Sequence, residues 1–296
     1  MAVEALLYKF FLGVVTGGSY GLVLFMVASG LTLIFGVAGV LNFAHGSLYM
    51  LGAYLAYFLM IHLGIFGVTL ILGSIGVGIA GVLMEKFFIK RVYDAPHLFQ
   101  ILLMYAFMLV FDDLVRAFAG PTVKEIPMPA FFQRPPLFLL GVPIPVYYLF
   151  ILAVSVAIVI ALRLFLYNTR FGKIIRAGAT DPEMLSVVGV NMPLVFTMVF
   201  GLGSFLAGLG GALAAPLRSI NPGMGDPVLL DSFIIVIVGG LGSIKGAFVA
   251  AILLGLIKSW GTMTFPLLEA GMPFLMMAVI LILRPQGLFG KPARLA

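Results

Sequence analysis

Cysteine is absent from this chain of 296 residues, and histidine and tryptophan are nearly so. Without cysteine there is no disulfide bond, no thiol nucleophile and no cysteine-ligated metal. The histidines, His45, His62 and His97, have no spacing that pairs them as ligands, so we expect no metal site. Charge is scarce too, because 9% of the residues are charged, against about 25% in a typical soluble domain. This scarcity argues against any soluble domain.

Motifs that an ATPase or an enzyme would need are also missing. Gly172-Lys173 and Gly290-Lys291 both lack the upstream glycine of a phosphate-binding loop, so any nucleotide energy must come from another polypeptide. An intramembrane enzyme would need a Ser/His, Asp/Asp or His-x-x-x-His arrangement at membrane depth, and none is convincing here. We therefore predict no catalytic residue and no cofactor in this chain.

Apolar residues dominate instead, at 62% of the chain. They form nine hydrophobic segments: 8–34, 38–60, 64–84, 98–118, 145–166, 193–215, 229–241, 246–264 and 270–284. Several exceed the roughly 20 residues needed to cross a bilayer, and backbone groups in lipid must be bonded internally, so these segments must be helices. The sequence predicts one all-α, multi-pass membrane domain over 1–296, with about eight or nine helices. Because 229–241 is short and ends in glycines, we expect a broken or half-crossing helix there.

Basic residues predict how the chain lies in the membrane. If the loop 85–97 is cytoplasmic, alternation places 163–191, 242–245 and the C-terminal tail on the same side. That side then holds 11 of the 17 basic residues: Lys86, Lys90, Arg91, Arg163, Arg170, Lys173, Arg176, Lys245, Arg284, Lys291 and Arg294. We therefore expect a cytoplasmic C-terminus and an extracytoplasmic N-terminus. Since this asymmetry explains the net charge of +6, we infer no nucleic-acid partner.

A proline-rich loop, 119–144, is predicted on the outer side. Proline fixes φ and removes a backbone donor, so this loop should be extended and stiff rather than helical. It is either a docking surface for an external protein or a plain connector.

A polar stretch, 163–191, interrupts the hydrophobic segments on the predicted cytoplasmic side. In it, Thr180-x-x-Glu183 fits a capping box, and Asp181 followed by Pro182 is an alternative helix start. An apolar turn then runs to Gly189, a residue type that commonly ends helices. A helix of about two turns is unstable alone, so it needs lipid or a partner protein to lie on. The alternative is an ordinary connector at the membrane surface.

Polar residues also occur at apparent membrane depth. Asn42, His45 and Ser47 lie among the helix-weakening glycines of 36–52. Buried polar groups cost free energy unless they are paired, so they usually face a cavity or another helix. One interpretation is a discontinuous helix whose free N–H groups hold a substrate carboxylate. The other is helix packing, in which Asn42 and His45 bond each other or backbone carbonyls.

A second glycine-rich stretch, 239–247, is similar in kind, and both stretches lead into long apolar helices. Such pairs in two halves of a chain suggest an internal repeat around a central pathway. For Gly17-x-x-x-Gly21 we expect close helix packing. The candidate pathway residues are Asn42, His45, Gly46, Ser47, Gly239, Gly240 and Gly242.

Three acidic residues, Asp112, Asp113 and Asp231, lie near predicted outer helix ends. An acidic pair inside a membrane can relay protons, so a proton-coupled carrier has to be considered. Their place near the interface favours solvated side chains instead, or pairing with Arg116, which is one helical turn from Asp112 and Asp113.

Three stretches resemble a known family. Residues 163–191, with Arg170-Phe171-Gly172-Lys173, Arg176-Ala177 and Gly189-Val190, resemble the cytoplasmic coupling segment of ABC importer permeases of the branched-chain amino acid type (LivH/LivM-like). Residues 36–46 are similar to the family's signature after its first helix. Residues 239–247 resemble its late glycine-rich motif. The resemblance extends over nearly the whole chain.

The resemblance implies a permease subunit of an uptake system in a bacterial-type cytoplasmic (inner) membrane. Its implied partners are membrane lipids, a related second permease subunit in a heterodimer, cytoplasmic ATP-binding subunits that use ATP and Mg²⁺, and an extracytoplasmic solute-binding protein. The element inserted into the ATPase would comprise Arg176, Thr180, Asp181, Pro182, Glu183, Met184, Leu185, Val188 and Gly189.

The solute is the least determined part of this interpretation. The resemblance implies a branched-chain or other hydrophobic amino acid, and relatives are expected to carry urea, short amides or aromatic acids. A stand-alone ion-coupled secondary carrier or channel is the alternative from another class, and it would need a charged site within the membrane.

Overall fold

Helices make up most of the structure, a computed structural model that describes residues 2–139 and 142–290. The α-helices are α1 (Ala2–Ala38), α2 (His45–Leu63), α3 (Phe66–Phe87), α4 (His97–Ala119), α5 (Val146–Asn168), α6 (Arg170–Gly178), α7 (Pro182–Val187), α8 (Met192–Ala214), α9 (Gly225–Gly239), α10 (Ile244–Thr264) and α11 (Met272–Leu283). Within the described residues, α1, α2, α3, α4, α5, α8 and α10 are long and apolar enough to cross a membrane. All nine predicted segments coincide with helices, so the all-α multi-pass prediction is confirmed.

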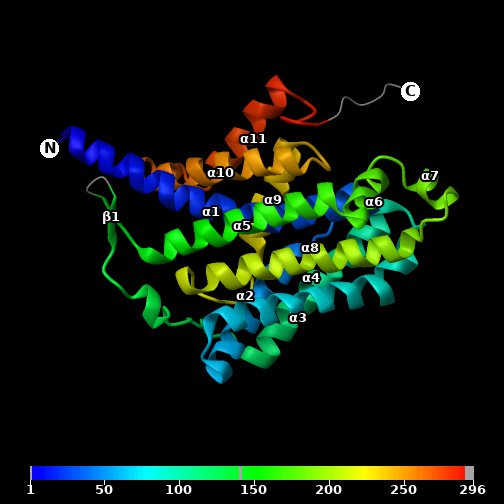
Figure 1. Cartoon of the computed structure of the whole chain (residues 1–296), viewed down its shortest axis with the longest axis horizontal. Coiled ribbons are helices and arrows are strands. Elements are labelled where there is room, and N and C mark those ends of the chain that lie inside the picture. Colours follow the sequence, from blue (N-terminus) through cyan, green and yellow to red (C-terminus); the bar gives the residue numbers. More distant parts are fainter. Residues whose placement is uncertain (1, 140–141, 291–296) are drawn as a thin grey trace.

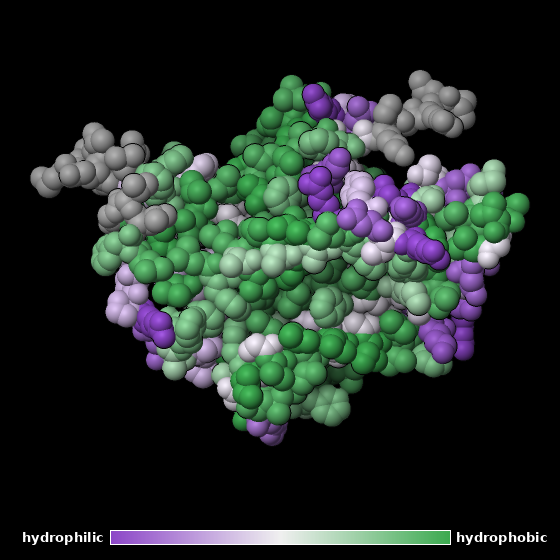
Figure 2. All heavy atoms as spheres, viewed as in Figure 1, coloured by the Kyte–Doolittle hydropathy of each residue, from purple (hydrophilic) through white to green (hydrophobic). Residues whose placement is uncertain are grey.

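The long helices run between two ends of an elongated bundle (Figure 1). One end, the α7 end, holds α6, α7 and the connections 88–96 and 240–243; there Gly36 lies beside Ala179. The other, the loop end, holds 119–144, and there the Phe66 ring packs edge-on against Phe132 and Tyr147. Figure 2 shows an apolar band over the helices between these ends, with hydrophilic residues gathered mainly at the α7 end. This distribution fits a bundle surrounded by lipid.

Basic residues concentrate at the α7 end, as the orientation argument requires. They come from the end of α3, the connection that follows it, α6 and the start of α10. Two of the eleven residues assigned to that side, Lys291 and Arg294, lie outside the described residues.

Two of the helices begin inside the bundle rather than at its surface. α1 ends at Ala38, and the irregular stretch 39–44 leads to α2, whose first ten residues include nine buried ones. The prediction of a helix from residue 38 is therefore wrong at its start; the break is hidden from hydropathy because 40–44 is mostly apolar. α9 has 15 residues, too few to span a bilayer of about 30 Å, in agreement with the half-crossing helix expected from the sequence.

Glycines let the long helices approach closely. α1 packs on α10, where a Cβ atom at Gly17 would lie 2.8 Å from the Gly255 carbonyl oxygen and one at Gly21 2.6 Å from the Ala251 carbonyl oxygen. The packing expected for the Gly17-x-x-x-Gly21 pair is thus confirmed. α8 packs on α3 in the same way, because a Cβ atom at Gly208 would lie 2.7 Å from that of Val77.

The chain contains two units of one architecture that run in opposite directions. In α1–α2–α3 and in α8–α9–α10, a long helix is followed by an irregular stretch, a helix that begins inside the bundle and a returning long helix (Figure 1). The first helix of each unit packs on the third helix of the other. Gly46 at the start of α2 contacts Gly225 at the start of α9, where the two units meet. This is an inverted repeat.

The two units also share a short sequence pattern, but at a different place from the one expected. Leu41-Asn42 precedes Gly46-Ser47 by the same spacing as Ile220-Asn221 precedes Gly225-Asp226. We expected 36–52 to pair with 239–247, but the order of the elements matches the stretch before α2 with the stretch before α9, and Gly46 contacts Gly225. The stretch 239–247 instead forms the tight connection between α9 and α10.

The proline-rich loop is largely extended, as predicted, with two local exceptions. A 3-10 turn, η2, covers Ala130–Phe132, and an antiparallel pair joins β1 (Leu137–Leu139) to β2 (Val142–Ile144), with Phe138 opposite Pro143. The loop is also bonded to the segment after α8: the Lys124 N–H donates to the Ile220 carbonyl at 2.8 Å, and the Ile220 N–H donates to Lys124 at 2.9 Å.

Candidate functional site

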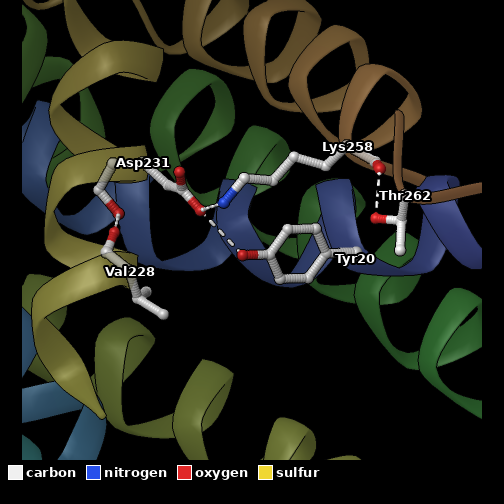
Figure 3. A network of polar contacts seen from close by, with 6 residues as sticks. Tyr20, Val228, Asp231, Lys258 and Thr262 are labelled. Atoms are coloured by element: carbon white, nitrogen blue, oxygen red, sulfur yellow. Dashed lines mark hydrogen bonds and ion pairs between the residues drawn. The ribbon is translucent and has the colours of Figure 1, made fainter. Parts of the chain in front are cut away.

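A largely buried charged pair joins α9 to α10, and α1 lies beside it (Figure 3). The Lys258 ammonium on α10 donates to the Asp231 carboxylate on α9 at 2.6 Å, and the Tyr20 hydroxyl on α1 donates to the same oxygen at 2.8 Å. Asp231 is only 4% exposed. Three helices thus meet at one carboxylate, whose negative charge is balanced by Lys258.

Sequence reasoning missed this pair. We expected Asp231 to be solvated or to pair with Arg116, and that prediction is wrong, because Asp231 is buried against Lys258. Asp112 is also buried, and it accepts a hydrogen bond from Ser47 at 3.2 Å. Only Asp113 behaves as predicted, with its carboxylate 3.6 Å from the Arg116 guanidinium. A signal was present: opposite charges in two different apolar segments tend to be partners.

A cavity of about 570 Å³ opens beside the charged pair. Its walls come from α1, α5, the end of α8 and the segment after it, the start of α9, α10 and the residues after α10. Tyr20, Lys258 and Arg218 are polar members of the lining, and the Arg218 guanidinium lies 4.6 Å from the centre of the Tyr20 ring. A second cavity, of about 350 Å³, shares Arg218 and Pro227 with the first. Arg218 therefore lies where the two cavities adjoin.

The predicted residues of α2 gather at the junction where α2 meets α9. His45 is fully buried, and its Nε2 lies 2.9 Å from the Val27 carbonyl oxygen, so that nitrogen carries the proton. Gly46 contacts the Gly225 backbone, and Ser47 bonds Asp112. Asn42 is fully buried, and neither group of its amide has a hydrogen-bond partner within the described part of the chain. Of the bonds considered for these two residues, His45 therefore makes one to a backbone carbonyl, whereas Asn42 and His45 do not bond each other through their side chains.

The predicted glycines of the second stretch lie elsewhere, at the α7 end. Gly239 packs against Gly246, and Gly240, with φ at +99°, packs against Gly290. Gly242 has φ at +78° and lies beside Gly36. A side chain would be strained at both positive-φ positions. The structure thus separates these glycines from the α2–α9 junction and gives them the role of a tight turn.

At the α7 end, the polar stretch that follows α5 forms two short helices, α6 and α7. Asp181 is the N-cap of α7, and its carboxylate accepts from the Met184 N–H at 2.9 Å. The capping box starting at Thr180 does not form, because the Thr180 hydroxyl donates to the Arg176 carbonyl at 3.3 Å. Of the two helix starts considered, the structure uses Asp181 with Pro182 at the first position. Gly189, with φ at +86°, follows the end of the helix, as expected.

The two faces of α7 differ. Leu185 lies against Gly178 of α6, whereas Met184, Val187 and Val188 are 60%, 81% and 67% exposed. Arg176 does not point to this surface: its Nε donates to the Leu166 carbonyl at 3.1 Å, and its guanidinium covers the Tyr167 ring. The remaining predicted coupling residues, Pro182 and Glu183, are exposed at the start of α7.

The α7 end also contains a buried carboxylate, which the sequence analysis did not single out and which links α3 to its neighbours. Glu85 on α3 is fully buried and accepts hydrogen bonds from the hydroxyls of Tyr93, at 3.1 Å, and of Thr197 on α8. Burial, and then the neighbouring Glu85 carboxylate, raise the pKa of the Tyr93 phenol, so it remains a donor at neutral pH.

Comparison with known proteins gives a consistent result across the chain. The family described as branched-chain amino acid transport system / permease component matches residues 13–283. The high-affinity branched-chain amino acid transport system permease protein BraD of Pseudomonas aeruginosa is 27% identical over 97% of both chains. LivH of Escherichia coli K12, a protein of the same description, is 25% identical over 97% of this chain and 96% of its own. A probable branched-chain amino acid transport permease protein of Methanocaldococcus jannaschii is 30% identical over 81% of this chain and 77% of its own. No solved structure matches. The chain belongs to the family of branched-chain amino acid transport system permease components.

Proposed function

We propose that this chain is the membrane-spanning subunit of an ABC importer and forms the pathway for branched-chain or other hydrophobic amino acids. Family membership and the names of the relatives support this solute class. Urea, short amides or aromatic acids are the alternative solutes within the same family. The chain itself carries no phosphate-binding loop, so ATP and Mg²⁺ are used by a partner subunit.

The observation that carries the proposal is the shape of α7. α7 is a helix of about two turns, and together with its C-cap residue Val188 it presents three apolar side chains to the surroundings, at the end of the bundle richest in basic residues. Such a helix is too short to be stable unless it is packed. Covering its exposed apolar side chains with a partner protein lowers the free energy of the complex. A groove on a cytoplasmic ATPase is the partner that fits.

The other partners follow from the two ends of the bundle. In this proposal the α7 end and the C-terminus are cytoplasmic, and the N-terminus and the loop end face outwards, where a solute-binding protein docks. A second, related permease subunit covers part of the apolar flank, giving a heterodimer. The solute passes beside the α2–α9 junction, near Asn42, whose amide has no hydrogen-bond partner among the described residues, and near His45, Gly46 and Ser47.

The test is co-purification of the complex from its native membrane in mild detergent. We expect an ATPase to be recovered with the wild-type chain and lost when Asp181–Val188 is replaced by a Gly/Ser linker. The same replacement at Gln133–Pro136, four exposed residues at the loop end, is the matched control and should retain the ATPase. Uptake of leucine into vesicles should require ATP. Solute-gradient uptake by the purified chain alone would overturn the proposal in favour of a stand-alone carrier.

A further inference from the structure

We infer that the cavity beside Tyr20 and Lys258 binds the carboxylate of an amino-acid solute, with Arg218 as the group that receives it. The inference rests on the proposed function and names the part of the solute that this chain recognises. The volume of about 570 Å³ is within the usual range of small-molecule sites.

The charges of the cavity leave Arg218 free to take a ligand. Lys258 is committed to Asp231, which also accepts from Tyr20. Arg218 lies against the face of the Tyr20 ring and forms no ion pair with any described residue. A guanidinium stacked on a ring keeps its N–H groups available at the edge, and its planar fork matches a carboxylate in two parallel hydrogen bonds.

The rest of the lining complements the other parts of an amino acid. Glu269 lies on the cavity wall, and it too has no ion pair within the described part of the chain. Among the described residues, one cation and one carboxylate without an ion-pair partner therefore line a single cavity, which suits a zwitterion, with Glu269 receiving the ammonium group. Apolar residues of the wall offer contacts for an aliphatic side chain: Val23, Ile151, Leu217 and Met263.

The position of Arg218 connects this site with the pathway. Arg218 and Pro227 line both cavities, and the second cavity extends to Tyr49 of α2 and to Asn221, the repeat counterpart of Asn42. A carboxylate held at Arg218 is therefore already next to the segment that leads into α9. Arg218 thus lies between the entrance at the loop end and the α2–α9 junction.

The experiment measures leucine uptake, over a range of leucine concentrations, by the complete importer in native-membrane vesicles. Arg218→Gln should raise the apparent KM about tenfold or more, because a charge-assisted bidentate contact is lost, and Arg218→Lys should recover part of the loss. Arg134→Gln is the matched control: Arg134 also lies 4.6 Å from an aromatic ring at the loop end, that of Phe131, but it is not in the cavity lining. It should leave uptake unchanged.

Two further readouts separate the explanations. 4-Methylpentanoate, which keeps the carboxylate, and isopentylamine, which lacks it, are added as competitors of leucine. The acid should inhibit the wild type more strongly than it inhibits Arg218→Gln, and the amine should inhibit both equally. ATPase activity stimulated by the solute-binding protein should survive in Arg218→Gln, which shows that the complex is folded and docks.

Three results would overturn the inference. Normal leucine uptake by Arg218→Gln would remove Arg218 from solute recognition. Loss of the stimulated ATPase activity in Arg218→Gln, with assembly intact, would make Arg218 a docking residue for the binding protein. Absence of leucine uptake in the wild type itself would refute the proposed solute class, and this inference with it.

Discussion

The Asp231 carboxylate shows how single charges survive among apolar helices. It has a lysine and a tyrosine hydroxyl as direct partners, and none of the three groups is close to another in the sequence. An ion of this kind is strongly unfavourable in a low-dielectric interior without its counter-charge. The pair therefore ties α9 to α10, while Tyr20 adds α1.

Removing one member of this pair should destabilise the fold. Asp231→Asn leaves the Lys258 ammonium uncompensated, and we expect a loss of about 3 kcal/mol in unfolding free energy. The double variant Asp231→Asn/Lys258→Met should recover most of it. Thermal unfolding in detergent measures both. Asp113→Asn, which breaks an exposed pair with Arg116, should change the stability by less than about 1 kcal/mol. Equal losses from the buried and exposed variants would contradict this account.

For single residues, the sequence could predict ion pairs within one helix but not ion pairs between helices. The Asp113–Arg116 contact spans three positions of one helix, so its geometry follows from helix periodicity alone. The Asp231–Lys258 contact spans 27 positions and two helices, so it depends on how α9 packs against α10. Arg218 gave no local signal, because it lies in an irregular segment after α8.

Among the elements, α2 and α9 differ from the other membrane helices because they begin inside the bundle. Their starts approach so closely that a side chain cannot be placed between them: a Cβ atom at Gly46 would lie 2.8 Å from that of Leu229 and 3.0 Å from the Gly225 carbonyl carbon. The junction is therefore held by backbone contact, which leaves little room for the start of one helix to move without the other.

A methyl group at this junction should be disruptive. Gly46→Ala meets the backbone of α9, so we expect a loss of about 2 kcal/mol or more and a sharp fall in uptake. Gly67→Ala is the control, since the added Cβ atom at this α3 position has open space around it. Because Gly67 is in the first turn of α3, this change should alter the stability by less than about 1 kcal/mol. A Gly46→Ala variant as stable and active as the wild type would refute the contact.

The cap of α7 should control how well this helix persists without its partner. Asp181→Ala removes the acceptor for the Met184 N–H and should cost about 1 kcal/mol of local stability. Amide hydrogen exchange within Pro182–Val187 should then accelerate about fivefold. Thr180→Ala should have a much smaller effect, because Thr180 does not cap the helix. A larger effect of Thr180→Ala than of Asp181→Ala would instead support the capping box that starts at Thr180.

Element prediction from sequence succeeded where hydropathy carries the information. All nine apolar segments are helices, and the shortness of 229–241 correctly indicated an incomplete crossing. The break at 39–44 lies in the stretch 36–52 for which a discontinuous helix was one interpretation, but hydropathy alone started a helix at residue 38, because 40–44 is mostly apolar. The two possible caps of α7 could not be separated from sequence, since both satisfy the same orphan N–H groups.

For the whole molecule, the inverted repeat explains why polar residues recur at matching places. Asn42 and Asn221 stand four residues before the glycines that meet at the centre. Asn42 is sealed in the interior, whereas Asn221 lines the cavity on the loop side. The sequence hinted at a repeat but pointed to the wrong partner segment, because glycine-rich composition also marks ordinary tight turns.

The proposed orientation can be tested directly, because the chain has no cysteine of its own. Gln133→Cys places a thiol at the loop end, and Ser186→Cys places one on α7, both at exposed positions. In intact cells with a permeable outer envelope, a membrane-impermeant maleimide should label Gln133→Cys and not Ser186→Cys. In inside-out vesicles the pattern should reverse. Labelling of Ser186→Cys in intact cells would invert the proposed topology.

The two hydrogen bonds between Lys124 and Ile220 couple the position of the proline-rich loop to that of the segment after α8. Ile220 is two residues from Arg218, so a protein that pulls or presses on the stiff loop moves the backbone that carries the guanidinium. In the proposed function, docking of the solute-binding protein on this loop therefore shifts the backbone at the cavity without any direct contact with Arg218. Lys124→Pro removes one of these bonds; we expect basal ATPase activity to stay unchanged and its stimulation by the binding protein to fall. Undiminished stimulation would mean that the loop and the segment after α8 move independently.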